Sequence, residues 1–358
     1  MSATNQLHNA GQSLWLDNIT RDLLDSGTLK RYIDELSVTG LTSNPTIFDH
    51  AIKNSSAYDA AIREKMLRGL SGEDLFFDIA LEDITRAADL FLPVFQRTNG
   101  VDGWVSLEVS PMIAHDTAST IAAAKQLHGR AARQNLFIKI PGTKEGLPAI
   151  EEAIFAGIPI NVTLLFSSEQ YVAAAEAYIR GIERRIASGL NPKVASVASV
   201  FISRWDSSVA GKAPAPLQNN LGIAIAKRTY RAYVQLLNSD RWRRTYNFGA
   251  RAQRLLWAST GTKDPKASDT LYVEALAASF TVNTVPEATL KEFGDHGKVG
   301  AMLDTDSEEI LAQFAKAGID VDALATQLQD DGAKSFVKSW EDLMSVISAK
   351  SAVLKKAS

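Results

Sequence analysis

Cysteine is the first thing this sequence lacks: none occurs among its 358 residues. Disulfides, thiolate zinc or iron–sulfur centres and a cysteine nucleophile are therefore excluded. No apolar run reaches about 18 residues, so we expect no membrane-spanning helix. Residues 1–9 are polar and have no apolar signal-peptide core, which favours a cytoplasmic protein.

An excess of charge of one sign is also missing. The chain has 38 basic and 41 acidic residues, a formal net charge of -3, and no basic face that would favour nucleic acid as a partner. Its five histidines show none of the spacings of a metal site, so no metal is expected. The composition does not shift along the chain, and we predict a single domain over residues 1–358 with helical additions.

Short apolar runs alternate with helical patterns along most of the chain, which is typical of βα units and a parallel sheet. Eight such units favour an α/β fold of the closed (β/α)8 barrel type over an open sheet. After residue 299 we expect only helices, an extension that either wraps the barrel or covers its mouth. The predicted strands are residues 13–18, 38–44, 103–110, 136–142, 158–166, 194–205, 254–261 and 279–286.

Local signals place several helices. Residues 72–96 carry apolar side chains at three- and four-residue spacing, a face suited to packing on a barrel. Ser167 and Gln170 form the pattern of a capping box, which predicts that a helix begins there. Thr305 and Glu308 repeat the pattern before a helix of the C-terminal extension.

A lysine, Lys139, stands in the middle of the apolar run 136–142. A buried ammonium is costly unless it is paired or neutralised. Burial favours the uncharged amine, which is the form that attacks a carbonyl carbon. The pattern predicts a lysine that forms a Schiff base. The alternative is an edge strand on which Lys139 lies in solvent.

Other polar side chains fall near the carboxyl ends of predicted strands, where barrel enzymes place their catalytic groups. Alternation directs Glu108 into the barrel beside Lys139, and places Asn161 and Thr163 together on one face of the fifth strand. Asp17 ends the first strand, where it faces the barrel mouth or caps the next helix. A lysine with carboxylates that move protons suits an aldol reaction through an imine, without a cofactor.

Two loops indicate an anion site. The sixth strand ends near Arg204, and the seventh is followed by Ser259, Gly261 and Lys263. Hydroxyls, a glycine and cations at the loops after the last strands of a barrel are typical of phosphate binding. A phosphorylated sugar is therefore the expected substrate.

Five segments resemble motifs of the transaldolase family, in the family's order. The resemblance implies a class I Schiff-base barrel of the pentose phosphate pathway that needs no cofactor. Such an enzyme moves a dihydroxyacetone unit from sedoheptulose 7-phosphate to glyceraldehyde 3-phosphate, giving erythrose 4-phosphate and fructose 6-phosphate. The segments are residues 14–17 (LWLD), 40–48 (GLTSNPTIF), 106–109 (SLEV), 138–143 (IKIPGT) and 160–166 (INVTLLF).

The resemblance also implies roles for single residues. Lys139 would form the imine, and Asp17 would be the acid and base at the C4 hydroxyl of the sugar. Glu108, through a water held by Thr163, would serve imine formation and hydrolysis. The residues implied for substrate binding are Asn44, Asn161, Ser199 and Phe201 around the dihydroxyacetone unit and Arg204 and Ser259 at the phosphate.

One position departs from the family. Many members have an arginine two residues after the serine that matches Ser259, and this chain has Gly261 there. We expect Lys263, two residues further, to take the place of that arginine at the phosphate.

Three other functions stay open at this point. An aldolase that releases free dihydroxyacetone, of the fructose-6-phosphate aldolase type, would use the same lysine. An isomerase or metal-dependent lyase would need ligand clusters that the sequence does not show. A non-enzymatic barrel conflicts with the polar strand ends. The sequence leaves a homodimer open.

Overall fold

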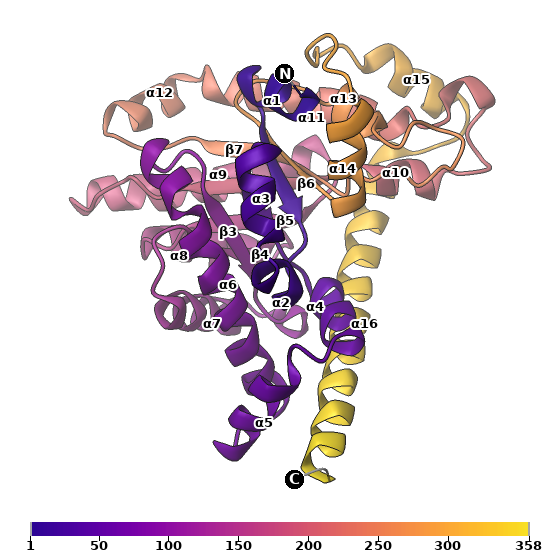
Figure 1. Cartoon of the computed structure of the whole chain (residues 1–358). Coiled ribbons are helices and arrows are strands. Elements are labelled where there is room, and N and C mark those ends of the chain that lie inside the picture. Colours follow the sequence, from indigo (N-terminus) through magenta and orange to yellow (C-terminus); the bar gives the residue numbers. More distant parts are fainter. Residues whose placement is uncertain (1, 357–358) are drawn as a thin grey trace.

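The structure, a computed structural model that describes residues 2–356, contains a closed barrel of eight parallel strands that follow one another in chain order (Figure 1). The predicted (β/α)8 class is confirmed. Most strands end before their apolar runs do, because the last residues of each run turn into the loops at the mouth. The strands are β1 (Ser13–Asp17), β2 (Val38–Thr42), β3 (Trp104–Glu108), β4 (Leu136–Pro141), β5 (Ile160–Leu165), β6 (Ser196–Phe201), β7 (Gln253–Ala258) and β8 (Val282–Val285).

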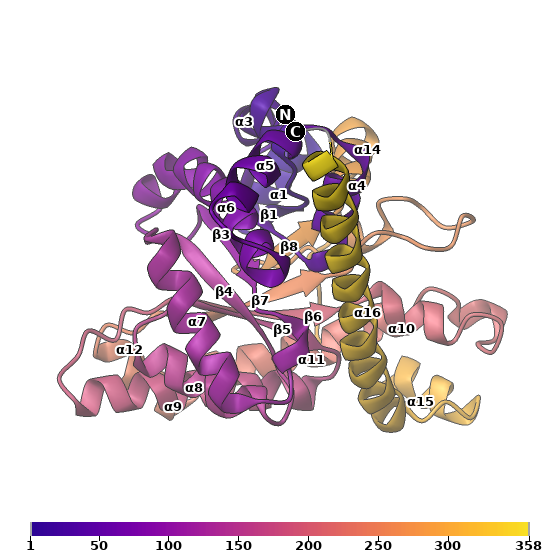
Figure 2. The same cartoon turned by 90° about the horizontal axis from the view of Figure 1, so that it is seen from below.

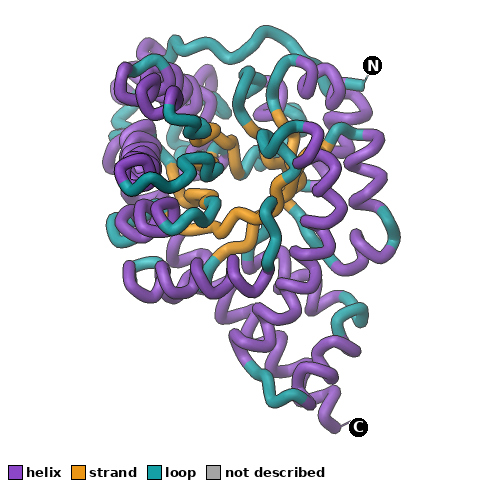
Figure 3. Tube along the Cα trace, turned by 90° about the vertical axis from the view of Figure 1, so that its left-hand side faces the viewer, coloured by secondary structure: helices purple, strands orange, loops and turns teal. Residues whose placement is uncertain are grey.

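Helices surround the barrel and continue after its last strand (Figure 3). Short 3-10 turns lie at Pro111–Ile113 and Ala215–Leu217. The helices are α1 (Ala3–Asn9), α2 (Arg21–Asp25), α3 (Thr28–Glu35), α4 (Pro45–Asn54), α5 (Asp59–Leu67), α6 (Gly72–Arg97), α7 (Thr117–Ala131), α8 (Gly146–Phe155), α9 (Ser168–Ala187), α10 (Ser203–Ser208), α11 (Leu221–Leu237), α12 (Asp240–Asn247), α13 (Leu271–Ala275), α14 (Glu287–His296), α15 (Glu308–Lys316) and α16 (Val321–Lys356).

The local helix signals are correct in two cases and wrong in one. Helix α6 covers the predicted residues 72–96, and both hydrogen bonds of the capping box at Ser167 open α9. Thr305 is not a cap. The Asp306 amide donates to the Asp304 side chain, so a local turn occupies these residues and α15 begins only at Glu308.

Aromatic rings fill the lower part of the barrel. The rings of Trp104 and Phe137 stack with centroids 4.1 Å apart, and Trp15 lies 6.2 Å from Phe137. Gly40 on β2 leaves the room that the ring of Trp15 occupies, since a Cβ there would lie 2.7 Å from that ring. These rings close the barrel interior beneath the cavity at the carboxyl ends of the strands, which is where barrel enzymes place their sites.

The C-terminal helix α16 runs along α4, with the carboxyl ends of β6 and β7 directed toward it (Figure 2). The Gln329 side chain donates to the carbonyl of Leu164 near the end of β5 (2.9 Å) and to that of Gly142 just after β4 (3.2 Å). Trp340 donates to Glu73 of α6 at 2.9 Å. Of the two arrangements open for the extension, α16 therefore covers the mouth. Within residues 2–356 we find no helix with the length and apolarity that crossing a membrane requires.

Candidate active site

Lys139 lies on β4 between β3 and β5, paired in register with Glu108 on one side and Asn161 on the other. Its Nζ is 3.2 Å from Oε2 of Glu108 and donates to the carbonyl of Ser43 at 3.1 Å. Lys139 and Glu108 are each only 5% exposed. The alternative that Lys139 lies in solvent on an edge strand is wrong, because a closed barrel has no edge.

Glu108 and Asp17 are two carboxyl groups that face one amine. Burial raises the pKa of Glu108, opposed by the ammonium of Lys139 and reinforced by the charge of Asp17. Burial likewise raises the pKa of Asp17, opposed by Lys139 and by the hydroxyl of Thr42, which donates at 2.7 Å. Because their pKa values are raised, both carboxyl groups can exchange protons closer to neutral pH than an exposed carboxyl group can.

Asp17 does not cap the helix that follows it. The cap of α2 is Thr20, whose hydroxyl accepts from the amide of Leu23 at 3.0 Å. Asp17 instead lines the cavity at the barrel mouth. The alternative role that the sequence left open for Asp17 is therefore wrong.

Strands β5 and β6 bring an amide and two hydroxyls to the amine. Ser199 donates to the side-chain oxygen of Asn161 at 2.7 Å, and the Asn161 amide donates to Ser106 at 3.2 Å. The hydroxyl of Thr163 is buried and has no hydrogen-bond partner within residues 2–356. Beside it the β5–β6 register shifts, and Leu164 has a left-handed φ of 58°. Such a bulge re-aims the side chains next to it.

A cavity of about 670 Å³ opens above Lys139 at the carboxyl ends of the strands. Glu108 and Asn161 do not line it and lie behind it, in contact with Lys139 and Ser199. The amide oxygen of Asn44 accepts from Ile47 at the start of α4, which leaves its NH₂ group to donate to a ligand. The predicted residues that line the cavity are Asp17, Asn44, Lys139, Thr163, Ser199, Phe201, Arg204, Ser259 and Lys263.

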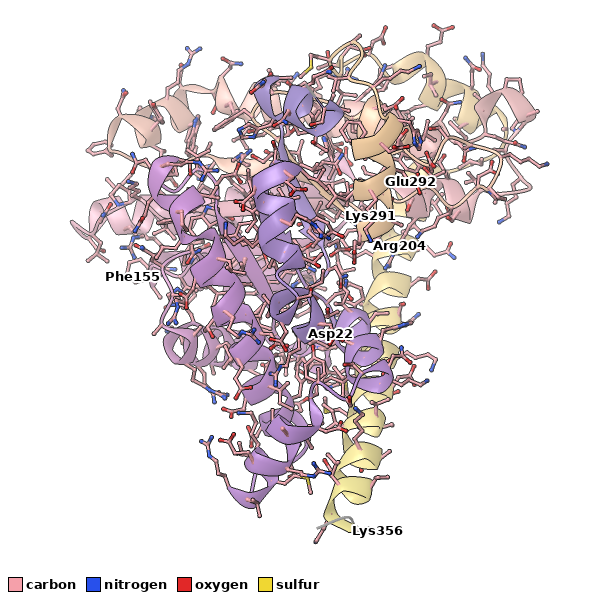
Figure 4. All side chains as sticks on the ribbon, viewed as in Figure 1. Asp22, Phe155, Arg204, Lys291, Glu292 and Lys356 are labelled. Atoms are coloured by element: carbon pink, nitrogen blue, oxygen red, sulfur yellow. The ribbon has the colours of Figure 1, made fainter. Side chains whose placement is uncertain are left out.

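Arg204 dominates the cationic end of this cavity, beside α16 (Figure 4). Its guanidinium lies over two rings, 5.0 Å from the centroid of Phe201 and 5.8 Å from that of Phe336. No carboxylate of residues 2–356 forms an ion pair with Arg204 or with Lys263, which is exposed at the rim. Ser259 begins the loop after β7 that carries Lys263, and its hydroxyl lies 2.9 Å from that of Ser203, the residue before Arg204. Unpaired cations with hydroxyls suit a phosphate.

Several residues that line the cavity were not predicted from the sequence, among them Thr42, Thr284 and Phe336. Thr42 and Thr284 hydrogen-bond each other at 2.7 Å, and Thr42 also holds Asp17. Thr42 ends a strand on the same face as Gly40, so the alternation that found Glu108 contained its signal. Phe336 comes from α16, and no periodic pattern assigns a helix outside the barrel to a particular strand end.

A single group of three metal-ligating side chains occurs within residues 2–356. Asp269, Glu292 and His296 bring their ligand atoms within 4.8 Å of one another. All three are exposed, and none lines the cavity above Lys139. The group therefore has no part in the chemistry at Lys139.

Residues 14–347 match the family model of Transaldolase/Fructose-6-phosphate aldolase. Transaldolase 2 of Nostoc punctiforme is 40% identical over 98% of this chain and 97% of its own length. The transaldolase of Thermobifida fusca is 43% identical over 96% of each chain. That of Arthrobacter sp. is 42% identical over 99% of each. The likeness covers the barrel and most of α16.

Proposed function

The chain belongs to the transaldolase/fructose-6-phosphate aldolase family, and we propose that it catalyses the transfer of a dihydroxyacetone unit from sedoheptulose 7-phosphate to glyceraldehyde 3-phosphate. The products are erythrose 4-phosphate and fructose 6-phosphate. The observation that carries the proposal is the buried amine of Lys139, 3.2 Å from one carboxyl group and in one cavity with another. This reaction is a step of pentose phosphate metabolism.

In the first step Nζ of Lys139 attacks the C2 carbonyl of the ketose. The carbinolamine loses its hydroxyl as water, and the C=N bond of the imine forms. Glu108 supplies and later recovers the proton, since it already lies at the amine. The unpartnered hydroxyl of Thr163 is suited to hold the water that enters or leaves.

In the second step Asp17 takes the proton of the C4 hydroxyl. The C3–C4 bond breaks, its electron pair moves into the imine, and the shortened aldose phosphate leaves. An enamine of dihydroxyacetone stays on Lys139. Transfer is the reverse sequence on the acceptor: C3 attacks the new aldehyde, and Asp17 returns its proton to the aldehyde oxygen.

The rest of the cavity holds the two ends of the substrate. Asn44 and Ser199 face the hydroxyls of the three-carbon unit, and Asn161 orients Ser199. Arg204, Ser259 and Lys263 receive the phosphate. A sugar phosphate chain thus runs from Lys139 outward to the cations at the rim.

Release of free dihydroxyacetone is not favoured as the main reaction. Relatives of 40–43% identity over nearly the whole chain are named transaldolase. The same lysine serves both reactions, so the acceptor decides between them. An assay of donor consumption with and without acceptor separates the two.

The test uses purified wild-type chain with sedoheptulose 7-phosphate. We expect fructose 6-phosphate and erythrose 4-phosphate in equal amounts, and donor consumption that stops when glyceraldehyde 3-phosphate is omitted. Lys139→Met, which puts an apolar chain of similar size in the strand, should keep the fold and abolish turnover. A rate of donor consumption that is the same with and without glyceraldehyde 3-phosphate would contradict the proposal.

A further inference from the structure

An aromatic ring from outside the barrel lies over the reactive amine. Phe336 of α16 is 6% exposed, lines the cavity, and has its ring centroid 6.0 Å from Nζ of Lys139. Its ring meets that of Phe201 edge-on, with centroids 6.5 Å apart. Together the two rings form an aromatic wall on one side of the cavity, with the guanidinium of Arg204 over its outer end.

Helix α16 is held in place on both sides of Phe336. Gln329 donates to the carbonyls of Gly142, just after β4, and Leu164, near the end of β5, and Gly332 packs so closely that a Cβ would lie 3.0 Å from Leu164. One residue before Trp340, the hydroxyl of Ser339 accepts from Thr46 of α4 at 2.8 Å. These contacts fix the height of the ring above Lys139, so Phe336 is a built part of the cavity.

We propose that Phe336 is the specificity-determining residue that keeps water from the covalent intermediate, so that the enzyme transfers dihydroxyacetone instead of releasing it. The inference rests on the proposed function and deepens it. It assigns this chemical task to α16, whose Phe336 packs against Phe201 of β6.

The enamine on Lys139 has two fates. In transfer, C3 forms a bond to the aldehyde carbon of the acceptor, and the aldehyde oxygen takes a proton. In release, C3 takes a proton instead. Water then adds to the imine carbon, the C–N bond breaks, and dihydroxyacetone leaves a free amine on Lys139. Only release requires a water to reach the intermediate while no aldehyde is bound.

A phenyl ring is suited to suppress release because it neither donates nor accepts a strong hydrogen bond. The other groups near Nζ, among them Glu108 and Thr163, hold and activate water, and imine formation needs them. Phe336 instead offers Nζ an apolar ring, and the polar neighbour of that ring, Arg204, is the cation proposed to bind the phosphate. Closure of a site against water is a general way to protect a reactive intermediate from hydrolysis.

The experiment compares wild type with Phe336→Ala on fructose 6-phosphate without an acceptor, with glyceraldehyde 3-phosphate removed by a coupled reductase. Wild type should release one burst of aldehyde and then stall as the enamine. Phe336→Ala should go on to release dihydroxyacetone at least about ten-fold faster, a change that corresponds to about 1.4 kcal/mol in the barrier. Phe336→Leu restores apolar cover and should return release toward the wild-type rate.

Trp340→Ala is the matched control. Trp340 is a buried aromatic residue one turn along α16 that lines no part of the cavity. It should weaken the docking of the helix while release stays slow. An equal rise in both alanine variants, or no rise in Phe336→Ala, overturns the assignment.

Failure of the inference and failure of the proposed function give different results. If wild type transfers normally and Phe336→Ala releases no more dihydroxyacetone than wild type, only the role of Phe336 is wrong. If wild type shows neither transfer nor an imine trapped by borohydride, the proposed function itself is wrong.

Discussion

At the scale of single residues, the site keeps a buried and a half-buried carboxyl group beside one buried amine, an arrangement that favours reactivity over stability. Burial raises the pKa of Asp17 and of Glu108 although Lys139 opposes the rise in both. Each carboxylate is therefore less stable in the fold than in an unfolded chain. Functional sites commonly carry such a cost.

The first prediction concerns stability and pH. Because the pKa of Asp17 is raised in the fold, its contribution to stability is full below its ordinary value of 3.8 and is lost as pH rises through the raised value. The side chain of Asp17→Asn stays neutral and can still accept from Thr42. The substitution should therefore raise the free energy of unfolding by about 0.5–2 kcal/mol at pH 7–8 and by almost nothing below about pH 4. Melting temperatures across pH test this.

Asp22→Asn is the control for that series, because Asp22 lines the same cavity but is exposed. It should not reproduce the gain of Asp17→Asn at pH 7–8. A gain in Asp17→Asn of equal size at every pH would show that the charge of Asp17 is not its source.

The second prediction separates the two carboxyl groups. Asp17→Ala should accumulate the substrate imine, because capture by Lys139 precedes cleavage. Glu108→Ala should slow the appearance of the imine, because Glu108 moves protons in its formation. Borohydride quenching at increasing times after mixing with fructose 6-phosphate measures both. If the two variants slow the same step equally, the division of roles is wrong.

At the scale of elements, we propose that the loops after β6 and β7 bind the phosphate of the substrate. Lys263 lines the cavity at its rim and has no carboxylate partner within residues 2–356. A charged hydrogen bond is typically worth about 1.5–3 kcal/mol, so Lys263→Ala should raise KM for fructose 6-phosphate about ten-fold or more. Its kcat/KM on unphosphorylated fructose should barely change.

A second substitution sharpens this test. Gly261→Arg restores the family's arginine, and the Cβ would lie 3.1 Å from Pro286, a contact that a small shift relieves. In the Lys263→Ala background it should recover part of the lost affinity for the phosphorylated sugar. Equal losses of Lys263→Ala on both sugars would mean that Lys263 supports the loop and does not bind phosphate.

The next prediction concerns the packing of β2 against the barrel floor. A Cβ on Gly40 would lie 2.7 Å from both the ring of Trp15 and the carbonyl of Trp104. Gly40→Ala should therefore lower the free energy of unfolding by about 1–3 kcal/mol through overpacking. Gly129→Ala lies inside α7 with no neighbouring side chain within 4 Å of the new Cβ, and it should instead raise the free energy of unfolding by up to about 1 kcal/mol. Denaturant unfolding checks the opposite signs, and equal effects would contradict the packing argument.

The strands, and the polar residues on them that we propose to be catalytic, were predictable because both depend on local alternation. A strand directs every second side chain into the barrel interior. The alternation therefore predicts which way a polar residue in an apolar run, such as Lys139 or Glu108, points. The register that puts these two side by side follows once the barrel is closed. The cap at Thr305 failed because nearby aspartates form a turn that competes with the helix start.

At the scale of the whole molecule, α16 completes a cavity that the barrel alone leaves open. Its place over the mouth depends on bonds between residues far apart in the chain, such as Gln329 with Leu164. No local pattern encodes such a pairing, and the sequence accordingly left both positions of the extension open. Phe336 could not be assigned from the sequence for the same reason.

We infer that the barrel, its loops and α16 together serve one covalent bond, at Lys139. The most direct measurement is borohydride reduction in the presence of fructose 6-phosphate, followed by peptide mapping. We predict a single modified peptide, with the label on Lys139, and no label in Lys139→Met. A label on Lys144, in the loop just after β4, or the absence of any label in active enzyme would contradict the account.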